Sequence, residues 1–135
     1  MSTDSAQTRF LQHDPHGFSN VVEVTGGRLV FITGQMALDA TGNLVGEGDY
    51  KAQFEQVFEN IKTQLDVVGA DFSQVVKITT LAEVGFAEHG LEFGEVRDRY
   101  VNLENPPASA IFLAPKLIHP GALVDISAIA HLPLA

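Results

Sequence analysis

Apolar residues recur along this chain with two different periods, which divide it into strands and helices. Two short β-rich runs, 21–24 and 29–32, flank Gly26-Gly27, a pair that tolerates positive φ, so we predict a hairpin here. Residues 1–17 show little apolar periodicity and are expected to form a flexible N-terminal lead-in. We therefore expect one domain, over 18–135.

Helical spacing begins after Asp49, a typical N-cap residue, and continues until Gly69. The apolar positions of this helix are Phe54, Val57, Phe58, Ile61, Leu65 and Val68. A strand is predicted over 75–82, a second helix over 86–102, and two further strands over 108–113 and 123–130. The predicted order, ββαβαββ, is that of an α+β fold.

The last predicted strand, 123–130, has two different faces. One face consists of Val124, Ile126, Ala128 and Ala130. On the other face, Asp125 and Ser127 interrupt an apolar surface. A carboxylate there needs a partner or a purpose: it acts as a general base or water-positioning group, or it bonds to backbone or to a neighbouring subunit as structural glue.

Composition and charge narrow the choice of partner. Of the 135 residues, 45% are apolar, and 17 Asp and Glu outnumber eight singly scattered Lys and Arg, for a formal net charge of −9. Such a chain has no basic stripe to neutralise phosphates, so nucleic acid is not expected as a partner. No run approaches the roughly 18 apolar residues of a membrane span, and no signal-like stretch is present. We expect a cytoplasmic protein that binds a small molecule and no membrane.

Thiol and metal chemistry find little support in the sequence. The absence of cysteine excludes disulfides, thiolate catalysis and cysteine-ligated metals. His13 and His16 have a separation that suits a metal, but their segment supplies no third rigid ligand, so we predict no metal site. Arg97 and Arg99 are expected to be solvated or ion-paired. Packing is the expected role of Phe54, Phe58, Phe93 and Tyr100.

Five segments form a set by their order and spacing. They are Thr33-Gly34-Gln35, Val68-Gly69-Ala70, Val75-Val76-Lys77-Ile78-Thr79, Pro106-Pro107-Ala108-Ser109 and the stretch 124–130. Together they resemble the YjgF/RidA (reactive-intermediate deaminase) family, from about Phe18 to His131. The resemblance implies a chorismate-mutase-like fold, with a mixed sheet and two helices packed on one face. It also implies a homotrimer with a central barrel and ligand clefts between subunits.

The family resemblance implies a chemistry as well. Archetypal members hydrolyse reactive enamines and imines to ammonia and a 2-keto acid, with no metal or organic cofactor. Asp125 matches the acid that positions the attacking water. The backbone amides of Thr33 and Gly34 would hold a carbonyl or carboxylate oxygen, although this pair could also be a plain strand end. Ser109 is a further ligand-contact candidate, or a hydrogen-bonded structural serine.

Several positions depart from the family pattern. Archetypal members clamp the substrate carboxylate with an arginine on the penultimate strand, where this chain has Ala108. Losing a contact worth about 1.5–3 kcal/mol should weaken carboxylate binding by one to two orders of magnitude or more. Phe18 replaces a tyrosine and Gly94 an asparagine, which removes two polar ligand contacts. Lys116 and His119, in the loop 115–121, are either compensating cations or solvated residues.

Two functions from different classes fit this sequence, so whether the protein is an enzyme stays open. The first is a divergent hydrolase or deaminase that acts on a small imine, enamine or related carbonyl metabolite. The second is a non-catalytic trimer that binds a metabolite or regulates a pathway. Retention of an acid at Asp125 favours the first, and loss of the arginine favours the second. A third function, ribonuclease action, is disfavoured by the acidic charge.

Overall fold

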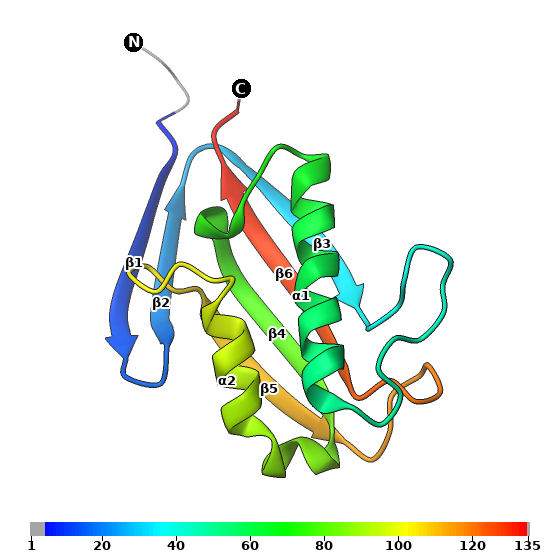
Figure 1. Cartoon of the computed structure of the whole chain (residues 1–135). Coiled ribbons are helices and arrows are strands. Elements are labelled where there is room, and N and C mark those ends of the chain that lie inside the picture. Colours follow the sequence, from blue (N-terminus) through cyan, green and yellow to red (C-terminus); the bar gives the residue numbers. More distant parts are fainter. Residues whose placement is uncertain (1–4, 135) are drawn as a thin grey trace.

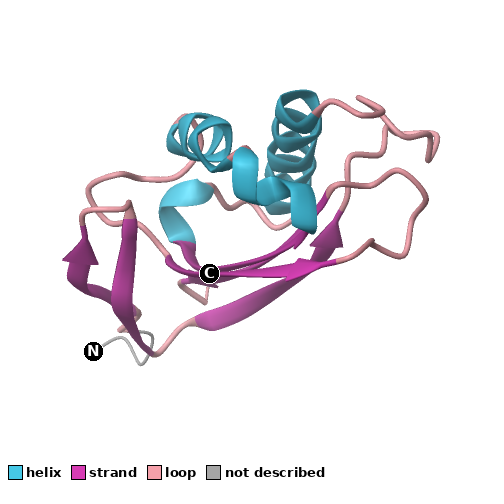
Figure 2. Ribbon diagram, turned by 90° about the horizontal axis from the view of Figure 1, so that it is seen from below, coloured by secondary structure: helices cyan, strands magenta, loops and turns pink. Residues whose placement is uncertain are grey.

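Four strands form a mixed sheet, and both helices lie on one of its faces (Figures 1 and 2). The computed structural model describes residues 5–134. The strands are β1 (Gln7–Asp14), β2 (Phe18–Thr25), β3 (Arg28–Gln35), β4 (Val75–Glu83), β5 (Ala108–Ala114) and β6 (Val124–Leu132), and the helices are α1 (Tyr50–Val67) and α2 (Gly90–Asp98). Two short 3-10 helices, Phe72–Gln74 and Val84–Glu88, precede β4 and α2. The α+β class is confirmed.

The order of strands in this sheet is β3-β6-β4-β5. Strands β4 and β5 run parallel, whereas β6 is antiparallel to both of its neighbours, β3 and β4. Strands β1 and β2 form a separate antiparallel pair beside β5. The start of β2 is tied to the segment before β5, because the buried Ser19 donates its Oγ to Pro106 O at 2.6 Å and its N to Pro107 O at 3.1 Å.

Helix α1 begins and ends where the sequence predicts. The Asp49 side chain accepts a hydrogen bond from the N of Ala52, and Gly69 takes a φ of 70° after the last turn. Its apolar stripe packs on the sheet with no solvent exposure: Phe54, Val57, Phe58, Ile61 and Leu65. The alternation predicted for the last strand is also confirmed, because its inward residues are at most 3% exposed over 124–130.

Three predictions of local structure are wrong. Residues 7–14 of the predicted lead-in form β1, whose apolar residues Phe10 and Leu11 are adjacent, so no alternation marks the strand. Residues 1–4 of that lead-in lie outside the described residues. The element order is therefore βββαβαββ.

The predicted hairpin over 21–32 is wrong as well. Gly26 and Gly27 do take positive φ values, 65° and 67°, so the chain turns there. The two strands then separate, because β2 pairs with β1 and β3 pairs with β6. The predicted second helix is shorter than expected: a 3-10 helix ends near His89 and α2 ends at Asp98.

The opposite face of the four-stranded sheet carries no helix within residues 5–134, and we call it the bare face (Figure 2). Register pairing places Phe31, Ile129, Lys77 and Ala108 in one row across this face. Large apolar side chains on it are open to solvent, including Phe31 at 72% and Phe112 at 58% exposure. An apolar surface of this kind is typical of a protein interface.

Gln53 joins α1 to two loops. Its side chain is fully buried, and Nε2 donates to Gly46 O and to Gly121 O, each at 3.0 Å. Its Oε1 accepts the N–H of Leu123 at 2.8 Å, two residues before Asp125. All hydrogen-bonding groups of this buried amide are therefore in use within the core.

Replacing Gln53 by leucine should destabilise the fold markedly. The change leaves two carbonyls and one N–H without partners, so we expect the free energy of unfolding to fall by about 3 kcal/mol. Urea denaturation measures this loss. Gln64→Leu, an exposed position on the same helix, is the matched control and should change stability by less than about 0.5 kcal/mol. Equal effects of the two substitutions would contradict this role of Gln53.

Candidate functional site

A β-bulge near the end of β3 brings two predicted site residues together. Ile32 pairs with Ala128 and Gln35 pairs with Ile126, so Thr33 and Gly34 together face the single residue Ser127. The extra residue turns Gln35 toward the helix side, where it lines cavities bordered by α1. Thr33 stays exposed.

Gly34 lies directly against Asp125. A Cβ atom added at position 34 would overlap Oδ1 of Asp125, so this close approach requires glycine. The φ of Gly34 is not in the left-handed region, and space alone imposes the requirement. The structure therefore brings Asp125, Gly34 and Thr33 to one place on the bare face.

Asp125 has no hydrogen-bond or ion-pair partner within residues 5–134, although it is only half exposed. Burial raises the pKa of its carboxyl above the ordinary value of 3.8. Its row neighbour on β4 is Leu81, which pairs with Phe112 on β5. A carboxylate with one apolar neighbour in its row, no partner and a raised pKa has the character of a general base.

The remaining predicted site residues lie elsewhere in the chain. Ala108 lies on the bare face, but four residues along β5 from the Asp125 row, which is about 13 Å at 3.3 Å per residue. Ser109 pairs with the buried Ile78 and so faces the helices. Neither residue carries a cation. Phe18, half-buried at the start of β2, adjoins the segment before β5 through its neighbour Ser19.

Gly94 lines an apolar cavity of about 480 Å³ between α2 and β5, with Phe93, Leu91 and Ile111. Arg97 borders the same cavity, where its Nη2 donates to His16 O at 3.1 Å and pairs with Asp98 at 3.0 Å. This arginine is therefore ion-paired, one of the two states predicted for it. One chain thus holds two groups of predicted site residues, on opposite faces of the sheet.

The loop 115–121 follows β5, and Lys116 is exposed in it. His119 is half-buried and its Nδ1 lies 3.0 Å from Pro120 O. Neither side chain has an ion pair within the described chain. The loop leads into β6 at the end that carries Asp125 (Figure 1).

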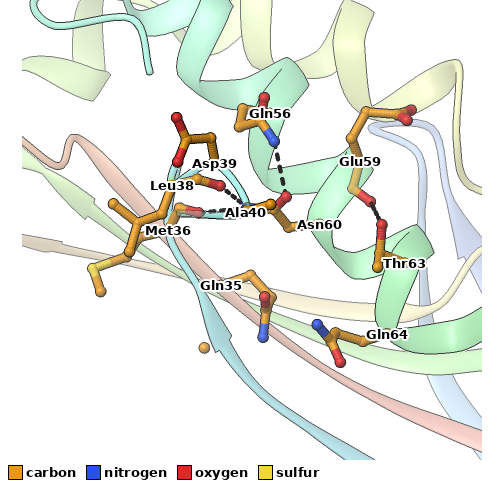
Figure 3. Close-up of a pocket in the computed structure, with 11 residues that line it drawn as sticks. Gln35, Met36, Leu38, Asp39, Ala40, Gln56, Glu59, Asn60, Thr63 and Gln64 are labelled. Atoms are coloured by element: carbon orange, nitrogen blue, oxygen red, sulfur yellow. Dashed lines mark hydrogen bonds between the residues drawn. The ribbon is translucent and has the colours of Figure 1, made fainter. Parts of the chain in front are cut away.

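The sequence analysis did not identify a polar cavity between the end of β3 and α1. Its volume is about 570 Å³, and Gly34 forms part of its wall. Figure 3 shows Gln56, Asn60 and Gln64 of α1 lining the same cavity. Asn60 donates Nδ2 to Met36 O and to Leu38 O, each at 2.9 Å, and Gln56 donates to Asn60 Oδ1 at 2.8 Å. These bonds fix the backbone that follows Gly34. Amides at four-residue spacing, 56, 60 and 64, are the sequence signal for this cavity.

No cluster of three or more metal-ligating side chains occurs among residues 5–134. His16 instead pairs with Asp14, with 2.6 Å between Nδ1 and Oδ1, in the turn between β1 and β2. Within the same range, no helix is long and apolar enough to cross a membrane.

The raised pKa of Asp125 predicts a pH-dependent effect of Asp125→Asn. The folded state binds this proton more tightly than the unfolded state, so the carboxylate costs stability once the pH exceeds its folded pKa. Asp125→Asn should therefore be more stable than the parent at about pH 7, and the gain should vanish as the pH falls below about 3.8. Urea denaturation at both pH values measures this. A gain that persists at low pH would exclude the electrostatic cause.

A double-mutant cycle tests the contact between Gly34 and Asp125. Gly34→Ala forces the carboxylate to move, and we expect it to cost about 1–2 kcal/mol of stability in the parent. In an Asp125→Ala background the same change should cost about 1 kcal/mol less. Additive effects in thermal denaturation would show that the two side-chain positions are independent.

Comparison with known proteins identifies the family. The family model described as Endoribonuclease L-PSP matches residues 12–132. Protein DfrA of Myxococcus xanthus is 39% identical over 115 residues, which cover 84% of this chain and 83% of DfrA. Protein HMF1 of Saccharomyces cerevisiae is 32% identical over 98 residues, 72% of this chain and 71% of HMF1.

A solved structure agrees with these matches. YyfB from Yersinia pestis, a protein of unknown function of the conserved Rid family, superposes with a TM-score of 0.77 at 31% identity, covering 93% of this chain and 98% of YyfB. The same arrangement of helices on one face of a mixed sheet is therefore shared. The chain belongs to the Endoribonuclease L-PSP family, also known as the YjgF/RidA family.

Proposed function

We propose that this protein hydrolyses a small imine, enamine or related carbonyl metabolite. The observation that carries the proposal is Asp125, a half-buried carboxylate with a raised pKa and no partner within the described residues, placed against Gly34. As a general base, Asp125 takes a proton from water as the water attacks the imine carbon. The N–H groups of the Thr33–Gly34 bulge hold an oxygen of the ligand. Asp125 returns this proton to the nitrogen to give a carbinolamine, and then carries the hydroxyl proton to the nitrogen as the C–N bond breaks. Ammonia leaves, and a carbonyl compound remains.

The cleft of this proposal lies between subunits of a homotrimer. Two observations support such an assembly. The bare face exposes several large apolar side chains, Phe31 and Phe112 among them, and association would cover them. The predicted site residues also fall into two groups on opposite faces of one sheet, so a second chain is needed to complete a site. In the trimer, the Asp125 group of one chain faces the Gly94 and Ser109 group of the next.

One observation favours a second function, the binding of a metabolite without turnover. Neither Ala108 nor Ser109 supplies the cation that would clamp a substrate carboxylate, and Arg97 is already paired with Asp98. A cleft without that clamp would bind a ligand of different charge. RNA cleavage, which the family name mentions, gains no support from a net charge of −9.

Ammonia release from small imines tests the hydrolytic role. We expect the parent to act on at least one member of a panel that contains 2-aminoacrylate and uncharged imines. Asp125→Asn should lower kcat at least about 100-fold, because a positioned base contributes that much or more. Asp66→Asn, an exposed position on α1, is the matched control and should leave kcat unchanged.

Two arginine variants distinguish hydrolysis of a ligand from binding without turnover. Ala108→Arg and Ser109→Arg each add a guanidinium, one on either face of the sheet, and a gain in 2-aminoacrylate turnover locates the carboxylate end of the cleft. Light scattering gives the mass of each variant. Binding of panel members without ammonia release, in a trimeric parent and in both arginine variants, would establish the second function instead.

A further inference from the structure

Lys77 occupies an unusual position for a lysine. It lies in β4, an inner strand of the four-stranded sheet, and its register partners are Ile129 on β6 and Ala108 on β5. Lys77 follows a register shift in β4, and its pairing with the outward Ile129, together with the burial of the next residue, Ile78, directs its side chain to the bare face. It is the only Lys or Arg that the strand registers place on that face.

The ammonium of Lys77 has no counter-charge nearby. The structure has four lysines, none with an ion pair or a side-chain hydrogen bond within residues 5–134, and Lys77 is the only one of them that is not exposed. Its row and the next one along the strands contain no Asp or Glu. Asp125 lies two rows away, about 13 Å along the strand.

Hydroxyl groups line the row beside Lys77. Thr79 and Ser127 are register partners on adjacent strands, and both are half-buried on the bare face. The bulge at Thr33 faces the same Ser127. A cation next to hydroxyl donors is the set of groups that binds a carboxylate or phosphate oxygen.

If the bare face is buried in an assembly, desolvation of the Lys77 ammonium costs free energy unless an anion binds beside it. An ammonium group taken out of water needs a charged partner, since desolvation costs several kcal/mol. In the proposed trimer, three Lys77 side chains would face one enclosed space, and no acid of their own rows could neutralise them. An anion from outside the protein resolves both problems.

We propose that Lys77, with the hydroxyls of Thr79 and Ser127, forms a binding site for a small oxyanion on the bare face. This inference rests on the assembly of the proposed function, which encloses the bare face. The site takes a carboxylate or a phosphate group, the two oxyanions that an ammonium and hydroxyls recognise alike. It stands beside Ala108, where the carboxylate clamp of archetypal family members is missing.

Titration calorimetry with sodium pyruvate, and separately with inorganic phosphate, tests the site at constant ionic strength. The parent should bind at least one of the two, and Lys77→Met should weaken that binding at least about tenfold, since a charge-assisted contact is lost. Lys77→Arg should keep affinity within about threefold, because the charge remains. Lys62→Met, an exposed lysine on α1, is the matched control and should bind like the parent.

Hydroxyl variants provide an independent measurement. Thr79→Val and Ser127→Ala should each weaken binding by about threefold to tenfold, in proportion to one hydrogen bond. If the parent binds neither anion, or if Lys77→Met binds as well as the parent, the site does not exist. Light scattering on the same samples keeps the proposals apart, because a monomeric mass contradicts the trimer, whereas a trimer without anion binding contradicts the Lys77 site alone. Binding of one anion and not the other identifies the ligand as a carboxylate or a phosphate.

Discussion

Five side chains of α1 with no solvent exposure pack over β3 and β6, in one core with the helix-facing residues of β4. Each buried side chain of this size contributes about 1.5–3 kcal/mol, so together they outweigh any single polar contact in the molecule. This packing uses only one face of the sheet. The outward positions of β4 and β6 therefore lie outside this core, and Asp125, Ser127 and Lys77 occupy them. A buried apolar layer could not accommodate these polar side chains.

Under the proposed function, the separation of the two faces means that one chain would not make a complete site. Asp125 and Gly34 lie on the bare face, whereas Gly94 lines a cavity beside α2 on the helix side. A rigid sheet cannot bring these two places together by a local movement. A function that uses both groups therefore depends on how subunits meet, and substitutions at the interface will affect it as strongly as substitutions of the acid itself.

Local patterns in the sequence correctly predicted the helices and strands whose buried side chains recur with a regular spacing. Helix α1, its Asp49 cap and the two faces of β6 follow directly from spacing, because each is set by one apolar surface. Strand β1 has no such surface: it is an exposed partner of β2 and has no apolar alternation. The Gly26-Gly27 turn predicted a hairpin, but a turn alone does not decide which strands pair.

The register between strands that are far apart in the sequence could not be predicted from local patterns, and the site depends on it. The pairing of Lys77 with Ala108 joins two strands that α2 separates in the sequence. The approach of Gly34 to Asp125 depends on a β-bulge, which no residue type in this segment predicts. The spacing of Gln56 and Asn60 on α1 did carry a signal for the polar cavity. Its meaning emerges only when the end of β3 is placed against that helix.

The bulge at Thr33 and Gly34 has a consequence for the evolution of chain length in this region. Substitutions at Thr33 change one exposed side chain and leave the alternation of β3 intact. Deletion of either residue would restore a regular ladder, turn Gln35 outward and shift the side chains beyond it by one position, so that the buried Ala37 would lose its place in the core. Relatives that keep this architecture should therefore vary in residue type at position 33 far more readily than in the number of residues in the bulge.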